Sequence, residues 1–408
     1  MKKLYLITKT FPLGAEEKAF LQYEAELLQE NFDLKIVVTE PGKENGGESD
    51  VKYNVVRAYA NSTVWGKMIS AIQFLCKREA WEEFAQIIKG KELIAKRLFR
   101  ALMFGTAAET FWKKLKTVCD IHKDIDAVFY FYWWDYKCLG VTMHKKKYPN
   151  MRIVTRTHGY DLYDERELYG KQFFKKQMER NLEKIFFISA YGKKYYEDHR
   201  GKKDDNKYVL CRLGVKEQTV QINTASTEFL LVSCSNVIPL KRIELIAEGL
   251  SLISDTKVNW IHFGDGELSE KIEAMAKKLL EEKENISYNF AGRVDNQTVM
   301  SFYRDNAVSC FITTTSTEGN PVSVQEALSF GIPVIGTDVS DIPLMIDGNG
   351  VLLPTNPSPL EVADAIMTVA ATSGEAQTAM QEKSYQIWAS DYNAEKNYDN
   401  FVKLLMKV

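Results

Sequence analysis

The sequence lacks several features that would place it in a special class of proteins. Its six cysteines are scattered, without a Cys-x-x-Cys pair, which argues against a zinc site or a disulfide framework and fits a reducing compartment. No apolar run approaches the roughly 20 residues needed to cross a bilayer. The first residues, MKKLYLITKTF, have too short an apolar core for a signal peptide and resemble a first strand instead. These absences predict a cytoplasmic protein that is soluble or peripheral to a membrane.

Charge is nearly balanced over the whole chain but is unevenly distributed. The formal net charge is −2 over 408 residues. Residues 1–220 hold 40 Lys and Arg against 30 Asp and Glu, a net of +10, whereas residues 221–408 hold 13 against 25, a net of −12. A chain of this length is expected to form two domains. The asymmetry indicates that these domains have different partners.

Short β-branched and aromatic runs alternate with helical patterns along most of the chain, which predicts doubly wound α/β domains. The alternation is interrupted by the polar segment 216–227, a predicted linker. We therefore predict an N-terminal Rossmann-like domain at 1–220 and a C-terminal Rossmann-like domain at 221–390, with a ligand in the cleft between them. Residues 391–408 are expected to form a final amphipathic helix.

Residues 62–118 depart from the alternation because they are helical in pattern throughout and rich in Phe, Leu, Ile, Trp, Lys and Arg. One interpretation is a set of core-packing helices with solvated basic faces. The other is a membrane-surface patch, since basic amphipathic helices bind anionic lipid headgroups. The sequence leaves both interpretations open.

Two acidic residues, Glu318 and Glu326, stand in a stretch that reads as strand, polar loop, helix and strand. The helix is expected to end at Gly331, a residue type that terminates helices. In open parallel sheets, ligands bind where such a loop follows a strand. A carboxylate there can accept hydrogen bonds from two vicinal hydroxyls, so two of them fit a nucleotide sugar. The alternative is one acid that caps the helix and one surface glutamate.

Two other turns in the C-terminal half could hold phosphate. Gly264 and Gly266 lie in HFGDGELSEKI, where a strand, a glycine turn and a helix start expose free amides; the alternative is a simple tight turn. Lys241 and Arg242 lie near the predicted start of a helix at 239–253. Cations are unfavourable at that end of a helix, and a bound diphosphate would offset the cost. The alternative is a solvated pair.

The N-terminal half offers fewer candidates. His158 in RTHGYDLYDE follows a strand end and would place an imidazole at the sheet edge, although a lone histidine is more often structural. Gly14 and Glu17 in PLGAEE follow the first strand. The aromatic run FYFYWWD, at 129–135, could line an apolar acceptor pocket, but most of it is better explained as core.

Together these segments resemble the retaining glycosyltransferases of family 4, which have the GT-B fold of two facing Rossmann-like domains. EGNPVSVQEALSFGIPVIGT is similar to the E-x7-E motif of that family and the A-x-x-x-G-x-P-V-I that follows it. TFPLGAEEKAFL and TRTHGYDLYDE are similar to first-domain motifs of bacterial polysaccharide-type members. The resemblance covers nearly the whole chain and implies a GT-B fold whose C-terminal helix, 391–408, crosses back to the first domain.

The resemblance implies a role for each matching residue. Glu326 would bind the ribose hydroxyls of the nucleotide, and Glu318 would hold hydroxyls of the donor sugar. Lys241 would contact the diphosphate, and His158 would approach the donor sugar from the first domain. The other implied contacts are the sugar and diphosphate loop at Asn320, Pro321 and Val322, the diphosphate turn at Gly264, the base at Val294, and room for both substrates at Gly14.

The chain departs from the family pattern before Lys241. The family usually has an arginine there in a Gly-Arg pair, whereas this sequence has Ser235 and Asn236. Asn236 can donate a hydrogen bond to a phosphate but carries no charge. Either Arg242 compensates, or the diphosphate is held less tightly.

The resemblance implies transfer of a sugar, with retention, from a nucleoside diphosphate sugar to a hydroxyl of a glycan or lipid-diphosphate-linked acceptor in cell-surface polysaccharide synthesis. The donor is a substrate, and no other cofactor, metal ion or nucleic acid is expected. The basic N-terminal half suggests work at the inner face of the plasma membrane. The alternatives are an epimerase of similar fold and a non-catalytic sugar-nucleotide-binding protein.

Overall fold

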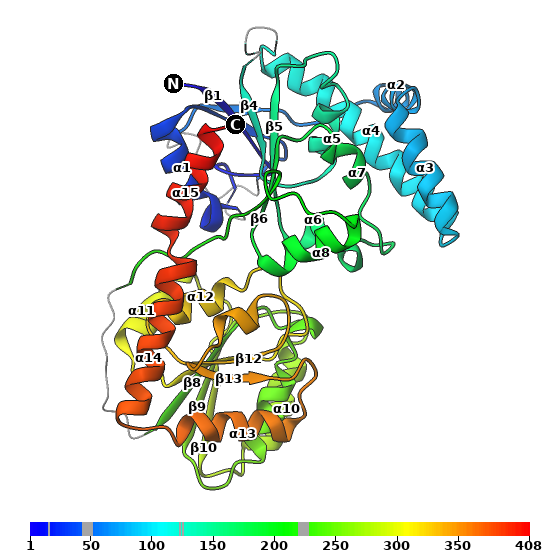
Figure 1. Ribbon diagram of the computed structural model, residues 1–408. Helices are drawn as coiled ribbons and strands as arrows, with labels where there is room; N and C mark the ends of the chain where they lie inside the picture. The colour runs from blue at the N-terminus through cyan, green and yellow to red at the C-terminus, as the bar shows by residue number, and fades with distance from the viewer. Residues whose placement is uncertain (15–16, 43–51, 122–123, 125, 219–227) are drawn as a thin grey trace. The chain divides into compact units, whose positions relative to one another are not determined.

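The computed structural model describes residues 1–14, 17–42, 52–121, 124, 126–218 and 228–408 (Figure 1). These residues form two compact units: unit 1 comprises 1–211 with 398–408, and unit 2 comprises 212–397. The division falls after Cys211, whereas the predicted boundary at residue 220, within the predicted linker, lies outside the described residues. No helix in the described part of the chain is long and apolar enough to span a membrane.

Unit 1 is built on a parallel sheet in the order β3-β2-β1-β4-β5-β6-β7. Its strands are β1 (Lys3–Thr8), β2 (Asp33–Val38), β3 (Val55–Arg57), β4 (Val128–Phe131), β5 (Arg152–Thr157), β6 (Lys184–Phe187) and β7 (Tyr208–Leu210). Successive side chains of a strand point to opposite faces. In β4, Phe129 and Phe131 therefore join one core, and Val128 and Tyr130 join another on the opposite face. Because both faces are covered, these strands read as nearly continuous apolar runs.

The helices of unit 1 fill the intervals between its strands. They are α1 (Lys18–Asn31), α2 (Val64–Leu75), α3 (Arg78–Gly90), α4 (Ile94–Val118), α5 (Tyr136–Thr142), α6 (Gly159–Leu162), α7 (Lys175–Glu179) and α8 (Ala190–Arg200). Helices α2 to α4 form the predicted helical segment between β3 and β4. Helix α5 ends at Thr142, whose hydroxyl donates to the Cys138 and Leu139 carbonyls and competes with backbone pairing.

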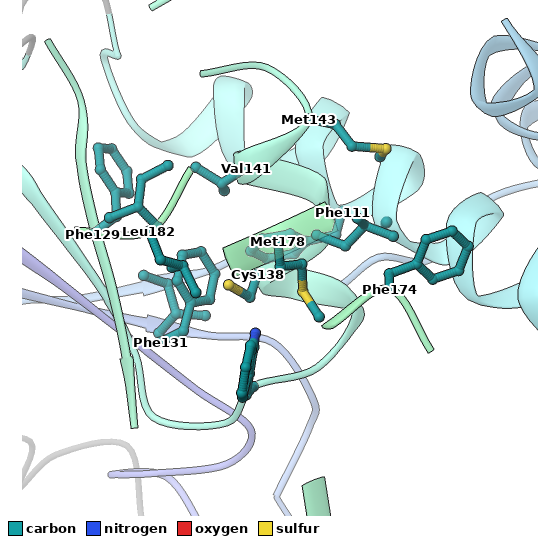
Figure 2. Close-up of a cluster of buried hydrophobic side chains, with 14 of the residues drawn as sticks. Phe111, Phe129, Phe131, Cys138, Val141, Met143, Phe174, Met178 and Leu182 are labelled. Carbon is teal, nitrogen blue, oxygen red and sulfur yellow. The ribbon is translucent and has the colours of Figure 1, made fainter. Parts of the chain in front are cut away.

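One face of the unit 1 sheet is covered by an aromatic core, part of which is drawn in Figure 2. Phe129 and Phe131 of β4 lie there with Cys138 of α5, Met178 of α7 and Phe111 of α4, all at most 1% exposed. Interdigitated aromatic and aliphatic side chains of this kind supply most of the burial free energy of a domain. This core therefore supports the sheet whose strands end at the candidate residues of unit 1.

The last residues of the chain pack on the opposite face of the same sheet. Phe401, Val402 and Leu405 of α15 (Ala394–Met406) are buried in a core with residues of β1, β2 and α1. There Glu24 and Arg156, both fully buried, form an ion pair, and the Arg156 guanidinium lies 4.2 Å from the centre of the Phe401 ring. Residues 398–408 are thus part of unit 1 although unit 2 precedes them in sequence.

Unit 2 is built on a second parallel sheet in the order β10-β9-β8-β11-β12-β13. Its strands are β8 (Phe229–Cys234), β9 (Val258–Phe263), β10 (Ile286–Phe290), β11 (Cys310–Thr313), β12 (Val334–Thr337) and β13 (Gly350–Leu353). Its helices are α9 (Glu244–Ser251), α10 (Ser269–Leu280), α11 (Asn296–Asp305), α12 (Val322–Ser329), α13 (Pro359–Ala370) and α14 (Glu375–Ile387). The two parallel sheets confirm the predicted α/β class with two doubly wound sheets.

Two elements of unit 2 differ from the sequence expectation. The helix expected at 239–253 is a 3-10 turn, Pro239–Lys241, followed by α9 from Glu244, because Arg242 adopts a left-handed conformation with φ of 50° and interrupts the helix. The short edge strand β13 was not expected. Neither difference changes the order of the strands that carry the candidate site residues.

Candidate active site

Glu318 and Lys241 are brought together by two neighbouring strands of unit 2. Lys241 ends the 3-10 turn after β8, Glu318 lies in the loop after β11, and their charged groups form an ion pair. The Ser340 hydroxyl fixes the loop, because it donates to the Glu318 carbonyl at 2.6 Å and accepts from the Glu318 N–H at 3.2 Å. The two side chains are 21% and 14% exposed, so both charges are accessible to a ligand at the carboxyl edge of the sheet.

The Arg242 side chain is hydrogen-bonded to the backbone around this loop. Its guanidinium donates to the carbonyls of Thr314, Thr315 and Thr355 at 2.6, 2.9 and 2.9 Å, and to Oδ1 of Asn356 at 3.0 Å. These bonds tie the ends of β11 and β13 to the turn that carries Lys241. The predicted contact of Arg242 with a diphosphate would require some of them to break, so the geometry favours an architectural role.

Glu326 lies inside helix α12 and is 8% exposed. Its Oε1 accepts a hydrogen bond of 2.6 Å from Nδ2 of Asn296, the first residue of α11. Burial raises the pKa of Glu326 to about 7, against the opposing effect of the Asn296 hydrogen bond. A carboxyl group in these surroundings gains from further hydrogen-bond donors, such as a pair of sugar hydroxyls.

The loop between the two glutamates is held by an amide pair. Nε2 of Gln325 donates to Oδ1 of Asn320 at 2.7 Å, while Nδ2 of Asn320 is buried without a hydrogen-bond partner in the described residues. Pro321 precedes the first helical residue, Val322. The N-terminal amides of α12 therefore lie directly after an unsatisfied amide donor, which favours an anionic or oxygen-rich ligand.

The glycine turn after β9 packs tightly on the turn after β8. Gly264 has a φ of 143°, and a Cβ there would lie 1.8 Å from the Ser235 carbonyl oxygen. A Cβ on Gly266 would lie 2.4 Å from the Val237 carbonyl oxygen. The tight-turn interpretation therefore explains both glycines. Asn236 is exposed between these contacts, within reach of solvent.

Val294, the expected base contact, follows a second turn at the same edge of unit 2. The Gly292 carbonyl accepts the Gly264 N–H at 2.9 Å, so the turns after β9 and β10 are joined. Val294 is half-buried and packs against a core of unit 2 that includes residues of α11 and α12. Its backbone lies just before Asn296, the partner of Glu326.

His158 stands at the carboxyl end of β5 in unit 1, as its position in the sequence predicts. Its ring lies 4.6 Å from the Tyr132 ring and 4.4 Å from the Trp133 ring, between centroids. Both ring nitrogens are buried and lack a hydrogen-bond partner among the described residues. Oδ2 of Asp161 lies 3.8 Å from Nδ1, and Oδ1 of Asp161 accepts the His158 N–H at 2.6 Å. The imidazole is therefore positioned while its hydrogen-bonding capacity remains unused.

Asp161 and Glu17 organise the surroundings of His158, a role that sequence reasoning missed for both residues. Burial acts to raise the pKa of Asp161, but interactions with His158 and Lys175 outweigh it, so this pKa lies below its usual range. The Glu17 carboxylate accepts the Trp133 indole N–H at 2.5 Å and the Thr10 N–H at 2.6 Å. The signal for Asp161 was its position three residues after His158, a capping spacing.

Gly14 meets its own loop closely. Its N–H donates to the Thr10 carbonyl at 2.9 Å, and a Cβ on Gly14 would lie 2.7 Å from Cβ of Thr10 and 3.3 Å from Cα of Gly42. The glycine is therefore required by packing within unit 1. In the part of the chain that the structure describes, no group of three or more His, Cys, Asp or Glu could hold a metal ion.

The C-terminal unit matches a known protein family. Residues 215–387 match the family model described as "Glycosyl transferases group 1". This range contains the predicted site residues of unit 2, including Lys241, Glu318 and Glu326. The residues of unit 1, with His158, lie outside it.

A curated relative supports the same family. The O-antigen biosynthesis glycosyltransferase WbnH of Escherichia coli is 29% identical over 162 residues, which are 37% of this chain and 44% of that protein. The match thus spans less than half of the relative's length.

Solved structures extend the similarity to the whole fold. The lipopolysaccharide outer core galactosyltransferase WaaB superposes with a TM-score of 0.67 at 14% identity and covers 99% of both chains. HepE of Anabaena, solved with UDP and glucose, superposes with a TM-score of 0.66 at 11% identity and covers 100% of both chains. At this identity the likeness establishes the fold, which is GT-B.

Proposed function

We propose that this chain transfers a sugar from a nucleoside diphosphate sugar to a hydroxyl group with retention of anomeric configuration, and the match of residues 215–387 to the group 1 glycosyltransferases supports this proposal. The observation that carries the proposal is the ion pair of Lys241 and Glu318 beside the loop that leads to the buried carboxyl of Glu326. One cation and two carboxyl groups match the diphosphate, the sugar hydroxyls and the ribose hydroxyls of such a donor.

In the proposed reaction, the bond between the anomeric carbon and the diphosphate oxygen breaks, and a bond to the acceptor oxygen forms on the same face of the sugar. The acceptor proton passes to the leaving diphosphate oxygen. Lys241 and the N-terminal amides of α12 stabilise the negative charge of the leaving group. Metal independence is part of this proposal.

The remaining residues are assigned to binding. Glu326 holds the ribose hydroxyls, and Glu318 holds donor-sugar hydroxyls once the diphosphate competes for Lys241. The unsatisfied Nδ2 of Asn320 is assigned to donate to a sugar oxygen, and the unsatisfied ring nitrogens of His158 to donate to or accept from sugar hydroxyls. The diphosphate is assigned to Pro321, Val322, Gly264 and Asn236, and the base to Val294. Gly14 is assigned to leaving room for the substrates.

The relatives support a substrate class for this proposal. WbnH acts in O-antigen biosynthesis and HepE was solved with UDP and glucose, which supports a uridine or related nucleoside diphosphate hexose as donor and a glycan or lipid-linked glycan as acceptor. We propose a role in cell-surface polysaccharide synthesis on the cytoplasmic side of the membrane.

The test begins with a thermal-shift screen of nucleoside diphosphates and their sugars, because a ligand that binds the folded state raises the melting temperature. The donor found in this way is then used to compare the wild type with Glu318→Gln. We expect that variant to lose about 10²- to 10³-fold in transfer rate while it still binds the nucleotide. Glu326→Ala should instead weaken nucleotide binding in calorimetry.

Glu282→Gln, an exposed carboxyl of the same unit, is the matched control and should keep wild-type turnover. Near-normal transfer by Glu318→Gln would refute its assignment to the donor sugar. An altered nucleotide sugar released without acceptor would identify an epimerase instead. Binding without turnover on any acceptor would identify a sugar-nucleotide-binding protein.

A further inference from the structure

Helix α2 carries an apolar face that points away from the core of unit 1. The large apolar side chains of this face are Val64 (75% exposed), Trp65 (74%), Met68 (49%), Ile69 (51%) and Ile72 (61%). Their spacing of three, four and seven residues places them on one side of a helix. The buried residues of α2 are Ser70 and Phe74. The helix is therefore more apolar toward solvent than toward the protein.

The two following helices extend this exposed apolar region. Of the 21 large apolar side chains that are exposed in the described residues, 11 lie between residues 64 and 103. They include Trp81 on α3 and Phe99 on α4, 62% and 64% exposed. Helices α2, α3 and α4 pack on one another and lie together outside the sheet of unit 1 (Figure 1). Soluble monomers seldom gather this much exposed apolar surface without a partner.

The same segment carries an excess of positive charge. Residues 62–104 hold eight Lys and Arg against four Glu. Three of these glutamates are already neutralised within the unit, by Arg78 and Arg180, by Lys171 and by Arg97. Within the described part of the chain, four exposed lysines have no ion-pair partner, namely Lys67, Lys89, Lys91 and Lys96. The apolar region is thus accompanied by unpaired cations.

We propose that the α2 apolar face and these four lysines form a docking surface for an anionic lipid bilayer. Trp65 and the aliphatic side chains of α2 would enter the boundary between headgroups and acyl chains, while the lysines contact lipid phosphates. Charge complementarity selects this occupant. In a symmetric pair of chains the same face would meet itself, which would bring unpaired lysines together, whereas anionic headgroups neutralise them.

The test is flotation of the full-length protein with phosphatidylcholine vesicles that contain or lack phosphatidylglycerol. We expect at least about tenfold more binding to the anionic vesicles, and this preference should fall with added salt as surface charges are screened. Ile69→Ser/Ile72→Ser should lower binding to anionic vesicles at least about tenfold. The control is Leu252→Ser/Leu360→Ser, which removes two exposed leucines of unit 2 and should bind like the wild type.

A second pair of variants tests the charge component separately. Lys89→Gln/Lys91→Gln should weaken binding and flatten its salt dependence, whereas Lys271→Gln/Lys278→Gln, at exposed positions of unit 2, should do neither. All these side chains are exposed, so the unfolding temperature should not change. The proposal is overturned by equal binding to neutral and anionic vesicles or by wild-type binding of Ile69→Ser/Ile72→Ser. It is also overturned if light scattering shows that this variant dissociates a dimer while vesicles are not bound.

Discussion

The two units hold their buried carboxyl groups in different surroundings. In unit 1, Glu24 pairs with a fully buried Arg156. Burial acts to raise the pKa of Glu109, but His144 and Lys77 outweigh it, so that pKa lies below its usual range. In unit 2, Glu326 accepts a hydrogen bond from the neutral amide of Asn296, and burial raises the pKa of Glu326 to about 7. Buried carboxylates of unit 1 thus pair with cations of the same unit, whereas the buried carboxyl of Glu326 in unit 2 is bonded to a neutral amide, which fits the proposed binding of ribose hydroxyls.

The largest effect is expected where the pairing in unit 1 is broken. Glu24→Ala should lower the free energy of unfolding by about 3–5 kcal/mol, because Arg156 would remain buried without its carboxylate. Urea denaturation followed by circular dichroism measures this loss. The control is Glu26→Ala, which removes a partly exposed pair with Lys52 at 3.6 Å and should cost no more than about 1 kcal/mol. Equal losses in both variants would contradict the comparison.

The next effect should have the opposite sign and lie in unit 2. Glu326 has a higher pKa in the folded than in the unfolded state, so its contribution to stability is lost as the pH rises from about 4.5 to 7. Glu326→Gln resembles the protonated form. The variant should therefore match the wild type near pH 4 and exceed it by about 3 kcal/mol at pH 8, at 1.36 kcal/mol per pKa unit.

Urea unfolding at several pH values, without nucleotide, measures this difference. Glu282→Gln, an exposed neutralisation in the same unit, should follow the wild type at every pH. A Glu326→Gln variant that is less stable than the wild type at pH 8 would show that Glu326 is as firmly paired as the carboxylates of unit 1.

A smaller effect is expected from the backbone of unit 2. Gly264→Ala should cost about 2–3 kcal/mol, since its Cβ would meet the Ser235 carbonyl oxygen at 1.8 Å and its φ is 143°. Gly292→Ala, with a φ of 66° and open space around its Cβ, should cost about 1 kcal/mol. The difference between the thermal unfolding midpoints of the two variants measures the cost of the steric contact at Gly264 beyond the cost of its positive φ. Equal costs would show that the contact between the turns after β8 and β9 adds nothing to the requirement for glycine at position 264.

The smallest effect is expected when the single hydrogen bond from Asn296 to Glu326 is removed. Asn296→Ala removes the group that opposes the raised pKa of Glu326, so that pKa should rise further above 7. The cost in stability should be about 1 kcal/mol, the usual value for one hydrogen bond. In the series of urea unfolding curves, the pH at which the wild type and Glu326→Gln diverge should move upward in the Asn296→Ala background. No movement would show that burial alone sets this pKa.

The alternation of strands and helices, and the E-x7-E spacing, were readable because each depends on local pattern. The contact between Lys241 and Glu318 was not, since it requires β8 and β11 to be neighbours although the two residues are 77 positions apart. The role of Arg242 was also hidden, because its guanidinium donates to four acceptors that are distant in sequence. For α2, periodicity identifies an apolar side, and only the structure shows that this side faces solvent.

One feature of unit 1 bears on how the chain is made. Its core is completed by Phe401, Val402 and Leu405, which follow the whole of unit 2 in sequence. A ribosome releases residues in order, and domains tend to fold as they emerge. Unit 1 must therefore wait, with the face beside α1 uncovered, until unit 2 has been synthesised. Unit 1 is therefore the first unit to be translated but the last to complete its core.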